Sequence, residues 1–295
     1  MKQAKALTLT YLTPVSFASL NGGDKEADNI SSIKKIAMGI DQYPYVSSQA
    51  VRRALRNQLE VLGWELSEGA AATIKKGAAT TQQEPQKYID DDLFGYMGTE
   101  SATEEKKGKA TKRTSVVRVS PLIALTPYQG DLDFGTNYMG VKTGGDPNIF
   151  ETEIHSGLYR GSILIELDRV GCKDGFDEDL PPEERAKRVK AFLTAVKNLW
   201  ASGRQSRFLA DISPKFIASA MLTTKNPVFL ESVRVAGDGT IDNQMIKETL
   251  QDYKDEIVES VIGVRTGAFN GEVAGAVTIG DAFNAMMQWV DTYYQ

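Results

Sequence analysis

The order of predicted strands and helices constrains this chain more than any other feature of its sequence. Apolar residues recur at helical spacing from Val51 to Leu62, and again between Pro182 and Ala201. β-rich runs precede, separate and follow these helices: residues 5–11, SVVRVSPLIAL from Ser115, GSILIELD from Gly161, FIASAML from Phe216 and VFLESVRV from Val228. The order strand, helix, strand, strand, helix, strand predicts an α+β, ferredoxin-like core, which is also the fold of RNA-recognition domains.

Two long stretches of sequence interrupt this core. Residues 64–114 are polar and contain too little apolar sequence to build a core of their own. Residues 126–160 form a 35-residue connection, longer than the roughly 12–15 residues that structureless loops rarely exceed. Two arms of about 12 residues would make it a hairpin that projects roughly 40 Å. The alternative is a loop folded back on its own domain.

Two further regions complete the single predicted domain, residues 1–295. Residues 12–46 are rich in Gly, Asn, Asp and Ser, which predicts a long loop with a short helix over Ile30–Met38. Residues 238–295 are acidic and predict two amphipathic helices, near Asp242–Val258 and Thr278–Asp291, that pack on the rest. Thr278 and Asp281 have the spacing of a capping box.

Several classes of protein are excluded by what the chain lacks. No apolar run approaches the roughly 18 residues of a membrane helix, and the first residues lack an apolar secretory segment. We therefore expect a cytoplasmic protein without membrane contact. Cys172 is the only cysteine and His155 the only histidine, so there is no internal disulfide, no zinc ribbon and little basis for a catalytic triad. We expect no catalytic residue, metal or cofactor.

Charge is distributed unevenly along the chain. The net charge of −5 alone argues against nucleic-acid binding, but residues 238–295 hold ten acidic residues against three basic ones, which leaves the first 237 residues slightly basic. One basic run lies between Glu104 and Arg118, with cations at Lys106, Lys107, Lys109, Lys112, Arg113 and Arg118. A second cluster, Arg52, Arg53 and Arg56, shares one edge of the first predicted helix.

The start of that helix has the chemistry of a phosphate site. Ser47, Ser48 and Gln49 precede the three arginines, so backbone N–H groups, hydroxyls and guanidinium groups converge at a positive helix end. The alternatives are a solvated helix flank for the arginines and a flexible surface loop for the basic run. Gly203 suggests a helix C-cap, and Arg204 and Arg207 after it could still face a ligand.

Several motifs in order carry a resemblance to a known family. SLNGGDKEADNISSIKKIA, YPYVSSQAVRRALR, KRTSVVRVSPLIAL, HSGLYRGSILIELDRVG and GRQSRFLADISP resemble the backbone subunit of type I CRISPR surveillance complexes, or Cascade, most closely its type I-B branch, the DevR autoregulator family. The resemblance covers about residues 5–236. It implies copies that polymerise along a CRISPR RNA (crRNA), with residues 64–114 as fingers and 126–160 as a thumb on an RNA-recognition-like palm. Implied partners are crRNA, target DNA, neighbouring copies, and the 5′-handle-binding, large PAM-reading and small subunits.

The resemblance also implies where the RNA lies. A subunit that accepts any guide must hold phosphates and sugars rather than read bases. The expected RNA-binding residues are Asn21, Lys34, Lys35, Ser47, Ser48, Gln49, Arg52, Arg53, Arg56, Lys112, Arg113, Thr114, Ser115, Arg204, Gln205 and Arg207. Four apolar or aromatic side chains lie in the expected thumb: Tyr138, Met139, Phe150 and Tyr159. They could wedge between bases of the guide, or they could fill a small core of the hairpin itself.

Two other functions stay open at this point. Backbone subunits of the related type III complexes cleave target RNA with an aspartate in the loop after the first strand, where this chain has Asp24, Asp28 and Asp41. Carboxylates there could bind a divalent metal, although no second set of ligands is evident. The older family name suggests an autoregulator that binds duplex DNA, but no helix-turn-helix pattern occurs.

Overall fold

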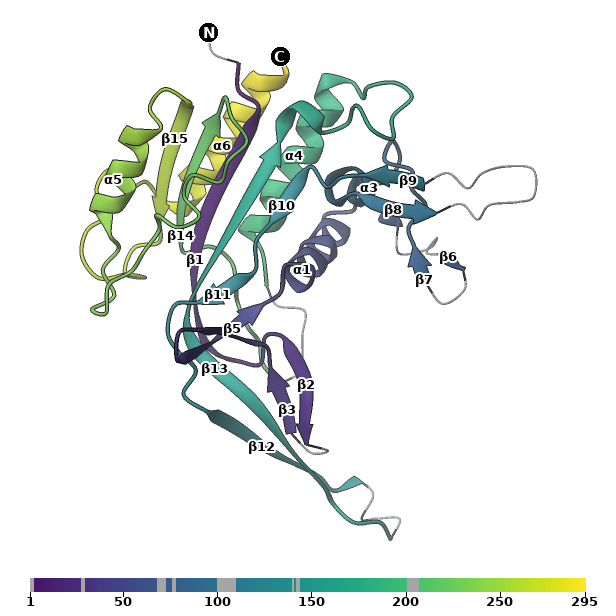
Figure 1. Ribbon diagram of the computed structural model, residues 1–295, viewed down its shortest axis with the longest axis vertical. Coiled ribbons are helices and arrows are strands. Elements are labelled where there is room, and N and C mark those ends of the chain that lie inside the picture. The colour runs from purple at the N-terminus through teal and green to yellow at the C-terminus, as the bar shows by residue number, and fades with distance from the viewer. Residues whose placement is uncertain are drawn as a thin grey trace.

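A large antiparallel sheet forms the centre of the computed structural model, which describes residues 3–27, 30–67, 73–75, 78–99, 110–139, 141, 144–200 and 207–295. The architecture is α+β, as the sequence predicts (Figure 1). The strands of the main path lie in the order β15 (Ile257–Val264), β14 (Phe216–Leu222), β1 (Ala6–Ala18), β13 (Asn148–Glu166), β11 (Leu122–Ala124), β5 (Asp41–Val46) and β4 (Lys35–Met38). A further short strand, β10 (Val117–Val119), also pairs with β13.

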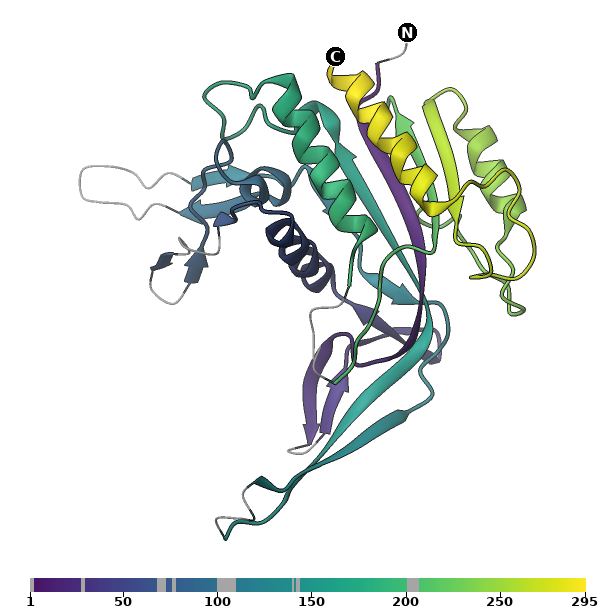
Figure 2. The same cartoon turned by 180° about the vertical axis from the view of Figure 1, so that it is seen from behind.

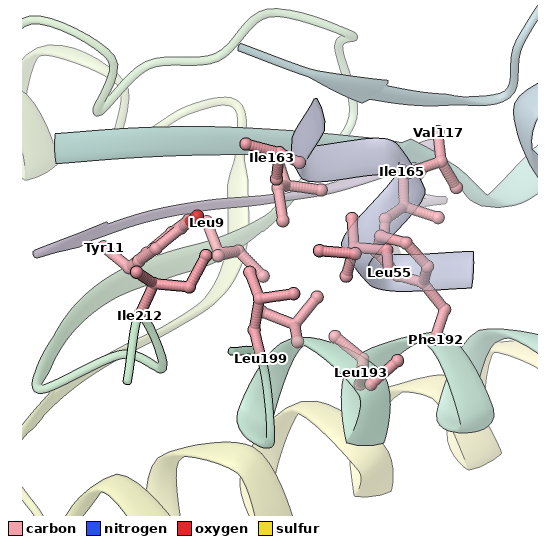
Figure 3. Close-up of a cluster of buried hydrophobic side chains, with 14 of the residues drawn as sticks. Leu9, Tyr11, Leu55, Val117, Ile163, Ile165, Phe192, Leu193, Leu199 and Ile212 are labelled. Carbon is pink, nitrogen blue, oxygen red and sulfur yellow. The ribbon is translucent and has the colours of Figure 1, made fainter. Parts of the chain in front are cut away.

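Three helices cover one face of this sheet (Figure 2). They are α1 (Ser48–Val61), α4 (Pro182–Lys197) and α6 (Ile279–Tyr294). Alternate residues of the strands point toward them, so Leu9 of β1 and Ile163 of β13 pack against Leu55 of α1 and Phe192 of α4 (Figure 3). α6 completes this core because Phe283, Met286 and Val290 are fully buried in it.

The opposite face of the sheet, here called the second face, is partly covered. Residues 228–246 and α5 (Asn243–Asp252) bury an apolar cluster against β14 that includes Phe229, Val233 and Ile246. Nearer β13, the second face is polar: the Thr10 and Ser162 hydroxyls lie 2.6 Å apart, and the Thr8 hydroxyl donates to the Ile163 carbonyl at 3.4 Å. In these strands the second face therefore lacks the row of exposed aromatic side chains on which an RNA-recognition sheet stacks bases.

A buried ion cluster attaches the 64–114 segment to the central sheet and its three covering helices, here called the palm. This segment contains β6 (Thr73–Lys75), β7 (Ala78–Thr80), α3 (Ile89–Phe94), β8 (Tyr96–Thr99) and β9 (Ala110–Arg113). The Asp92 carboxylate accepts from Arg113 at 2.5 Å, from Arg188 of α4 at 2.8 Å and from the Gly171 N–H at 3.0 Å, and all three side chains are almost fully buried. Gly95 follows α3 with φ +68°, where a Cβ would collide with the backbone of Arg113.

A long hairpin, here called the arm, extends away from the rest of the molecule (Figure 1). β12 (Asp131–Asn137) pairs with the first part of β13 in antiparallel register, from Asp131 opposite Ile154 to Asn137 opposite Asn148. β13 has 19 residues and continues from the arm into the central sheet. β2 (Gly22–Ala27) and β3 (Ile30–Ile33) flank the base of the arm, where β3 runs parallel to β13.

Three of the sequence-based predictions of secondary structure are wrong. The 12–46 region is mostly strand rather than loop, and Ile30–Met38 forms β3 and β4 instead of a helix, because these residues find pairing partners in β13 and β5. VFLESVRV forms turns, and its apolar residues Val228, Phe229 and Val233 are buried against β14 without joining a sheet. The helix expected up to Val258 ends at Asp252, because the β-branched residues from Ile257 onward pair with β14 as β15.

Other predicted elements are confirmed. α1, α4 and α6 lie where the helical spacing places them, and the Thr278 hydroxyl caps α6 by accepting the N–H of Asp281 at 3.1 Å. The run from Ser115 gives two short strands, β10 and β11, because Pro121 between them cannot donate a ladder hydrogen bond. Of the helices in the described parts of the chain, none is long and apolar enough to span a membrane.

Candidate nucleic-acid interface

Several expected RNA-binding residues meet where β5 turns into α1. Ser47 is the N-cap of α1, and its hydroxyl accepts the Ala50 N–H at 3.3 Å. The Asn21 side-chain oxygen accepts the Ser47 N–H at 2.8 Å, which ties the end of β1 to the start of the helix. Gln49 is exposed beside them. The positive end of a 14-residue helix with adjacent hydroxyl and amide groups is a suitable place for a phosphate.

The three arginines of α1 have different environments. Arg52 donates to the Phe94 carbonyl at 2.5 Å, and its guanidinium lies 5.2 Å from the centre of the Phe94 ring. Arg56 lies 4.4 Å from the same ring centre and contacts Asp90 at 3.4 Å. Burial, together with the neighbouring charge of Arg56, lowers the pKa of Arg52. Both residues thus brace α3 as well as offering positive charge, whereas Arg53 is exposed on the helix surface.

Arg113 corrects the sequence-based expectation. Its Nε donates to the Asp92 carbonyl, and its Nη1 donates to the Cys172 and Asp174 carbonyls. Its Nη2 donates to the Asp92 carboxylate and to the Arg169 carbonyl. Because the side chain is fully buried, it stabilises the attachment of the insertion and cannot contact a phosphate in this conformation.

The neighbours of Arg113 are more accessible. Lys112 and Thr114 are exposed, whereas the Ser115 hydroxyl donates to the Val117 carbonyl at 2.6 Å and is only partly accessible. Lys112 and Thr114 are therefore the accessible members of the set expected in this region.

Lys35 is engaged at the base of the arm. Its ammonium lies 2.7 and 2.8 Å from the two oxygens of Glu153 and 4.5 Å from the centre of the Tyr128 ring. Glu153 also accepts the N–H of Ile33 at 2.9 Å. This pairing neutralises much of the charge of Lys35, so we assign Lys35 chiefly to holding the arm. Lys34 lies between β3 and β4 and is half-buried.

Arg207 joins the segment after α4 to the arm. It donates to Thr152 at 3.1 Å, pairs with Asp133, and lies 4.8 Å from the ring centre of Phe150. Asp133 and Thr152 are opposite each other in the register, so Arg207 contacts a single face of the hairpin. Arg204 and Gln205 lie outside the described residues.

The four expected thumb residues have different positions. Tyr138 and Met139 lie at the far end of β12 and are 62% and 82% exposed, as a wedge requires. Phe150 is half-buried and packs over Gly135, where any side chain would collide with the ring. Tyr159 corrects the prediction: it is buried in the palm, its hydroxyl lies 2.8 Å from His155 Nδ1, and burial raises its pKa.

Exposed apolar residues on the arm were missed by the sequence analysis. Leu132, Phe134 and Ile149 lie on the face of the hairpin opposite Arg207 and are each exposed by 45% or more. Ile36 and Met38 of β4 form a similar exposed strip. The alternation of apolar and polar residues in DLDFGTN could have revealed this apolar face. However, such alternation ordinarily predicts a strand whose apolar face is buried, not one whose apolar face is open to solvent.

Two of the three aspartates of the catalytic alternative lie in strands that the structure describes. Asp24 lies in β2, Asp41 is exposed at the start of β5, and Asp28 falls outside the described residues. Over the portion of the chain that the structure describes, no group of three His, Cys, Asp or Glu side chains is placed to hold a metal ion.

Comparisons with known proteins agree on one family. Residues 11–256 match a family model described as "CRISPR-associated negative auto-regulator DevR/Csa2". A CRISPR-associated protein Cas7/Cst2/DevR from Myxococcus xanthus is 32% identical over 238 residues, which covers 75% of this chain and 73% of that protein. A CRISPR-associated aCascade subunit Cas7/Csa2 from Saccharolobus solfataricus is 26% identical over 185 residues, which covers 58% of this chain and 52% of that protein.

Solved structures share the fold. A chain of a CRISPR RNA-guided surveillance complex superposes with a TM-score of 0.60 at 16% identity and covers 96% of this chain and 99% of its own length. A chain of a surveillance complex in a pre-nicking state gives a TM-score of 0.62 at 13% identity and covers 97% and 100%.

Proposed function

The chain belongs to the DevR/Csa2 family of CRISPR-associated proteins and is a Cas7-family subunit of a CRISPR complex; from that premise we propose that it is the repeated backbone subunit of a type I surveillance complex. Copies polymerise along crRNA, bind its sugar-phosphate backbone without reading sequence, and present the guide for pairing with target DNA. Its further partners are the 5′-handle-binding, large PAM-reading and small subunits. Head-to-tail contacts between identical copies generate such filaments.

The observation that carries this proposal is the junction of β5 and α1 beside the base of the arm. Hydroxyl, amide and cationic groups gather there from Ser47, Asn21 and Lys34, while the arm reaches far beyond the palm. Phosphate and sugar contacts of this kind position a nucleic acid without reading its bases. The exposed apolar tip of the arm suits displacement of a base at intervals.

We also infer that the palm is a ferredoxin-like core of the RNA-recognition type. The strand order β14, β1, β13, β11, with all neighbours antiparallel and with α1 and α4 on one face, supports this assignment. Because the second face is polar and lacks exposed aromatic side chains in these strands, we infer that RNA lies at the edge of the sheet, near α1, and does not stack on the strands.

Removing exposed cations should weaken RNA binding equally for all sequences. Arg53→Ala combined with Lys112→Ala should lower affinity for single-stranded RNA and reduce the slope of log K against log salt by about 0.7 for each phosphate that the variant no longer neutralises. These residues are preferable to Arg52 and Arg56, whose stacking on Phe94 would confound binding with folding. Fluorescence anisotropy over a salt series measures both quantities.

The matched control for this variant is Lys254→Ala, which removes an exposed cation from the acidic C-terminal part. It should leave the affinity and the salt slope unchanged. A folded Arg53/Lys112 double variant with wild-type affinity and slope would contradict the proposed phosphate surface.

We propose that the chain is not itself a nuclease. Incubation of the assembled complex with guide-matched RNA and Mg²⁺ or Mn²⁺ should leave the RNA intact, because no group of three His, Cys, Asp or Glu side chains in the described residues is placed to hold a metal ion. Gel analysis measures the product lengths. Regularly spaced cleavage that disappears in Asp24→Ala or Asp28→Ala would instead support the type III-like alternative.

A further inference from the structure

A cavity of about 310 Å³ opens on the polar part of the second face. It lies between β10 and β13 on one side and residues 225–230 on the other. Leu164, Pro227 and Leu230 give it an apolar floor, and the side chains of Ser120 and Ser162 contribute polar atoms. The Ser120 hydroxyl accepts the Ser162 N–H at 2.8 Å and donates to the Pro121 carbonyl at 2.8 Å, so this wall is held in place.

Two cations at the edge of the cavity are fixed by one buried carboxylate. Arg118 donates to Glu166 from Nε at 3.0 Å and from Nη2 at 2.5 Å, while Lys225 donates to the other Glu166 oxygen at 2.9 Å. Glu166 is 3% exposed, whereas 59% of the Arg118 side chain faces solvent. Burial acts to raise the pKa of Glu166, but hydrogen bonds from Lys225 and Arg118 outweigh it and hold the pKa below its ordinary value. The carboxylate therefore remains charged and keeps both cations oriented.

The surroundings of this pair leave an excess of positive charge. Lys225 also contacts Asp168 at 2.7 Å, Arg169 contacts Glu166 and Asp174, each at 3.4 Å, and Lys173 contacts Asp168 at 3.2 Å. Four cations thus face three carboxylates. One more anionic group at the exposed side of Arg118 would balance the cluster and would meet N–H donors that are already oriented.

We propose that this cavity binds one nucleotide of a single-stranded nucleic acid, with the base on the apolar floor and the phosphate on Arg118 and Lys225. The volume is near the lower end of the roughly 300–1,000 Å³ of small-ligand pockets, which suits a single nucleotide better than a peptide segment. The site also continues the basic run: Arg169, which contacts Glu166, donates to the Thr114 carbonyl at 3.0 Å, next to the exposed Lys112.

This proposal rests on the proposed function for the identity of the ligand, but it places a contact away from the α1 surface. The RNA guide and a DNA strand share the required chemistry, so the test uses both.

The experiment is photocrosslinking of the full chain with 12-nucleotide single strands that contain 4-thiouridine or 4-thiothymidine, followed by mass spectrometry of the adducts. The proposal expects adducts on the peptides that carry Leu164 and Leu230. Arg118→Gln should lower the yield of these adducts about tenfold because it removes a charge-assisted hydrogen bond to the phosphate. Leu230→Trp, which fills the cavity from its half-buried edge, should abolish them. The RNA and DNA arms show which strand the site prefers.

Two controls separate this site from the α1 surface. Arg234→Gln removes an exposed cation from the neighbouring segment and should change no adduct. Arg53→Ala should weaken overall binding but leave the position of the cavity adducts unchanged. Normal RNA binding without adducts in the cavity would overturn this inference alone, whereas absence of all binding would overturn the proposed function as well. An acidic, leucine-containing peptide serves as a second probe, for protein docking. If Arg118→Gln abolished binding of this peptide and left the oligonucleotide adducts intact, the cavity would be a protein-docking site and the inference would be wrong.

Discussion

Replacing Asp92 by alanine is expected to lower the free energy of unfolding by about 3–5 kcal/mol. The carboxylate is fully buried and pairs with two buried arginines, Arg113 at 2.5 Å and Arg188 at 2.8 Å. Removing it leaves two positive charges without a buried counter-charge and also deprives the Gly171 N–H of its acceptor. This decrease is a large fraction of the roughly 5–15 kcal/mol by which a domain is stable. Urea denaturation followed by fluorescence measures the change.

The location of the damage can be checked separately from its size. Asp92 joins the 64–114 insertion to α4, so limited proteolysis of the Asp92→Ala variant should cleave within the insertion before the palm. Asp174→Ala is the matched control, because its carboxylate is 63% exposed and pairs with Arg169 at 3.4 Å at the surface. It should change the stability by no more than about 1 kcal/mol. An Asp92 variant as stable as the control would show that the ion cluster contributes little.

Shortening the arm is expected to abolish assembly on RNA while leaving a folded monomer. Deleting residues 134–151 and joining Asp133 to Thr152 through Asn-Gly keeps the register of the remaining hairpin, since Asp133 and Thr152 are opposite each other. Ile154 and Tyr159 stay in the palm core, and Arg207 keeps its partners Asp133 and Thr152. The variant loses the exposed tip and the apolar face that includes Phe134 and Ile149.

The physical basis of this expectation is avidity. A single copy offers a few phosphate contacts, whereas copies coupled along one guide strand bind it with a high effective concentration. Light scattering with and without a guide-length RNA measures the particle size. A milder variant, Leu132→Ser with Phe134→Ser, isolates the apolar face from the tip, and Thr136→Ser on the same strand is its control. Long RNA-bound particles of wild-type size from the shortened arm would refute a coupling role.

Local sequence patterns predict amphipathic helices well, because the apolar face and the capping residues of such a helix all lie within the helix itself or next to it in the chain. The spacing of apolar residues locates α1 and α4 well, and the Thr278 and Asp281 pair locates the start of α6. The same reasoning fails for Ile30–Ile33, because strand formation there depends on β13, more than a hundred residues away in the chain. It also fails for Val228–Val233, whose apolar residues are buried by turns against a strand rather than in one.

For the candidate site, the sequence determined which chemical groups are present and which of them lie close in the chain: a serine-capped helix start with three following arginines, and a basic run that leads into a strand. Only the tertiary structure decided which cations face solvent. Lys35 is neutralised by Glu153, 118 residues away, and Arg188 meets Asp92 at a separation of 96 residues. Burial of a charge depends on whether folding brings an opposite charge to it, and no local pattern encodes a partner so distant in the chain. Arg113 therefore became a structural residue, while Arg118, a few positions later, faces an open cavity.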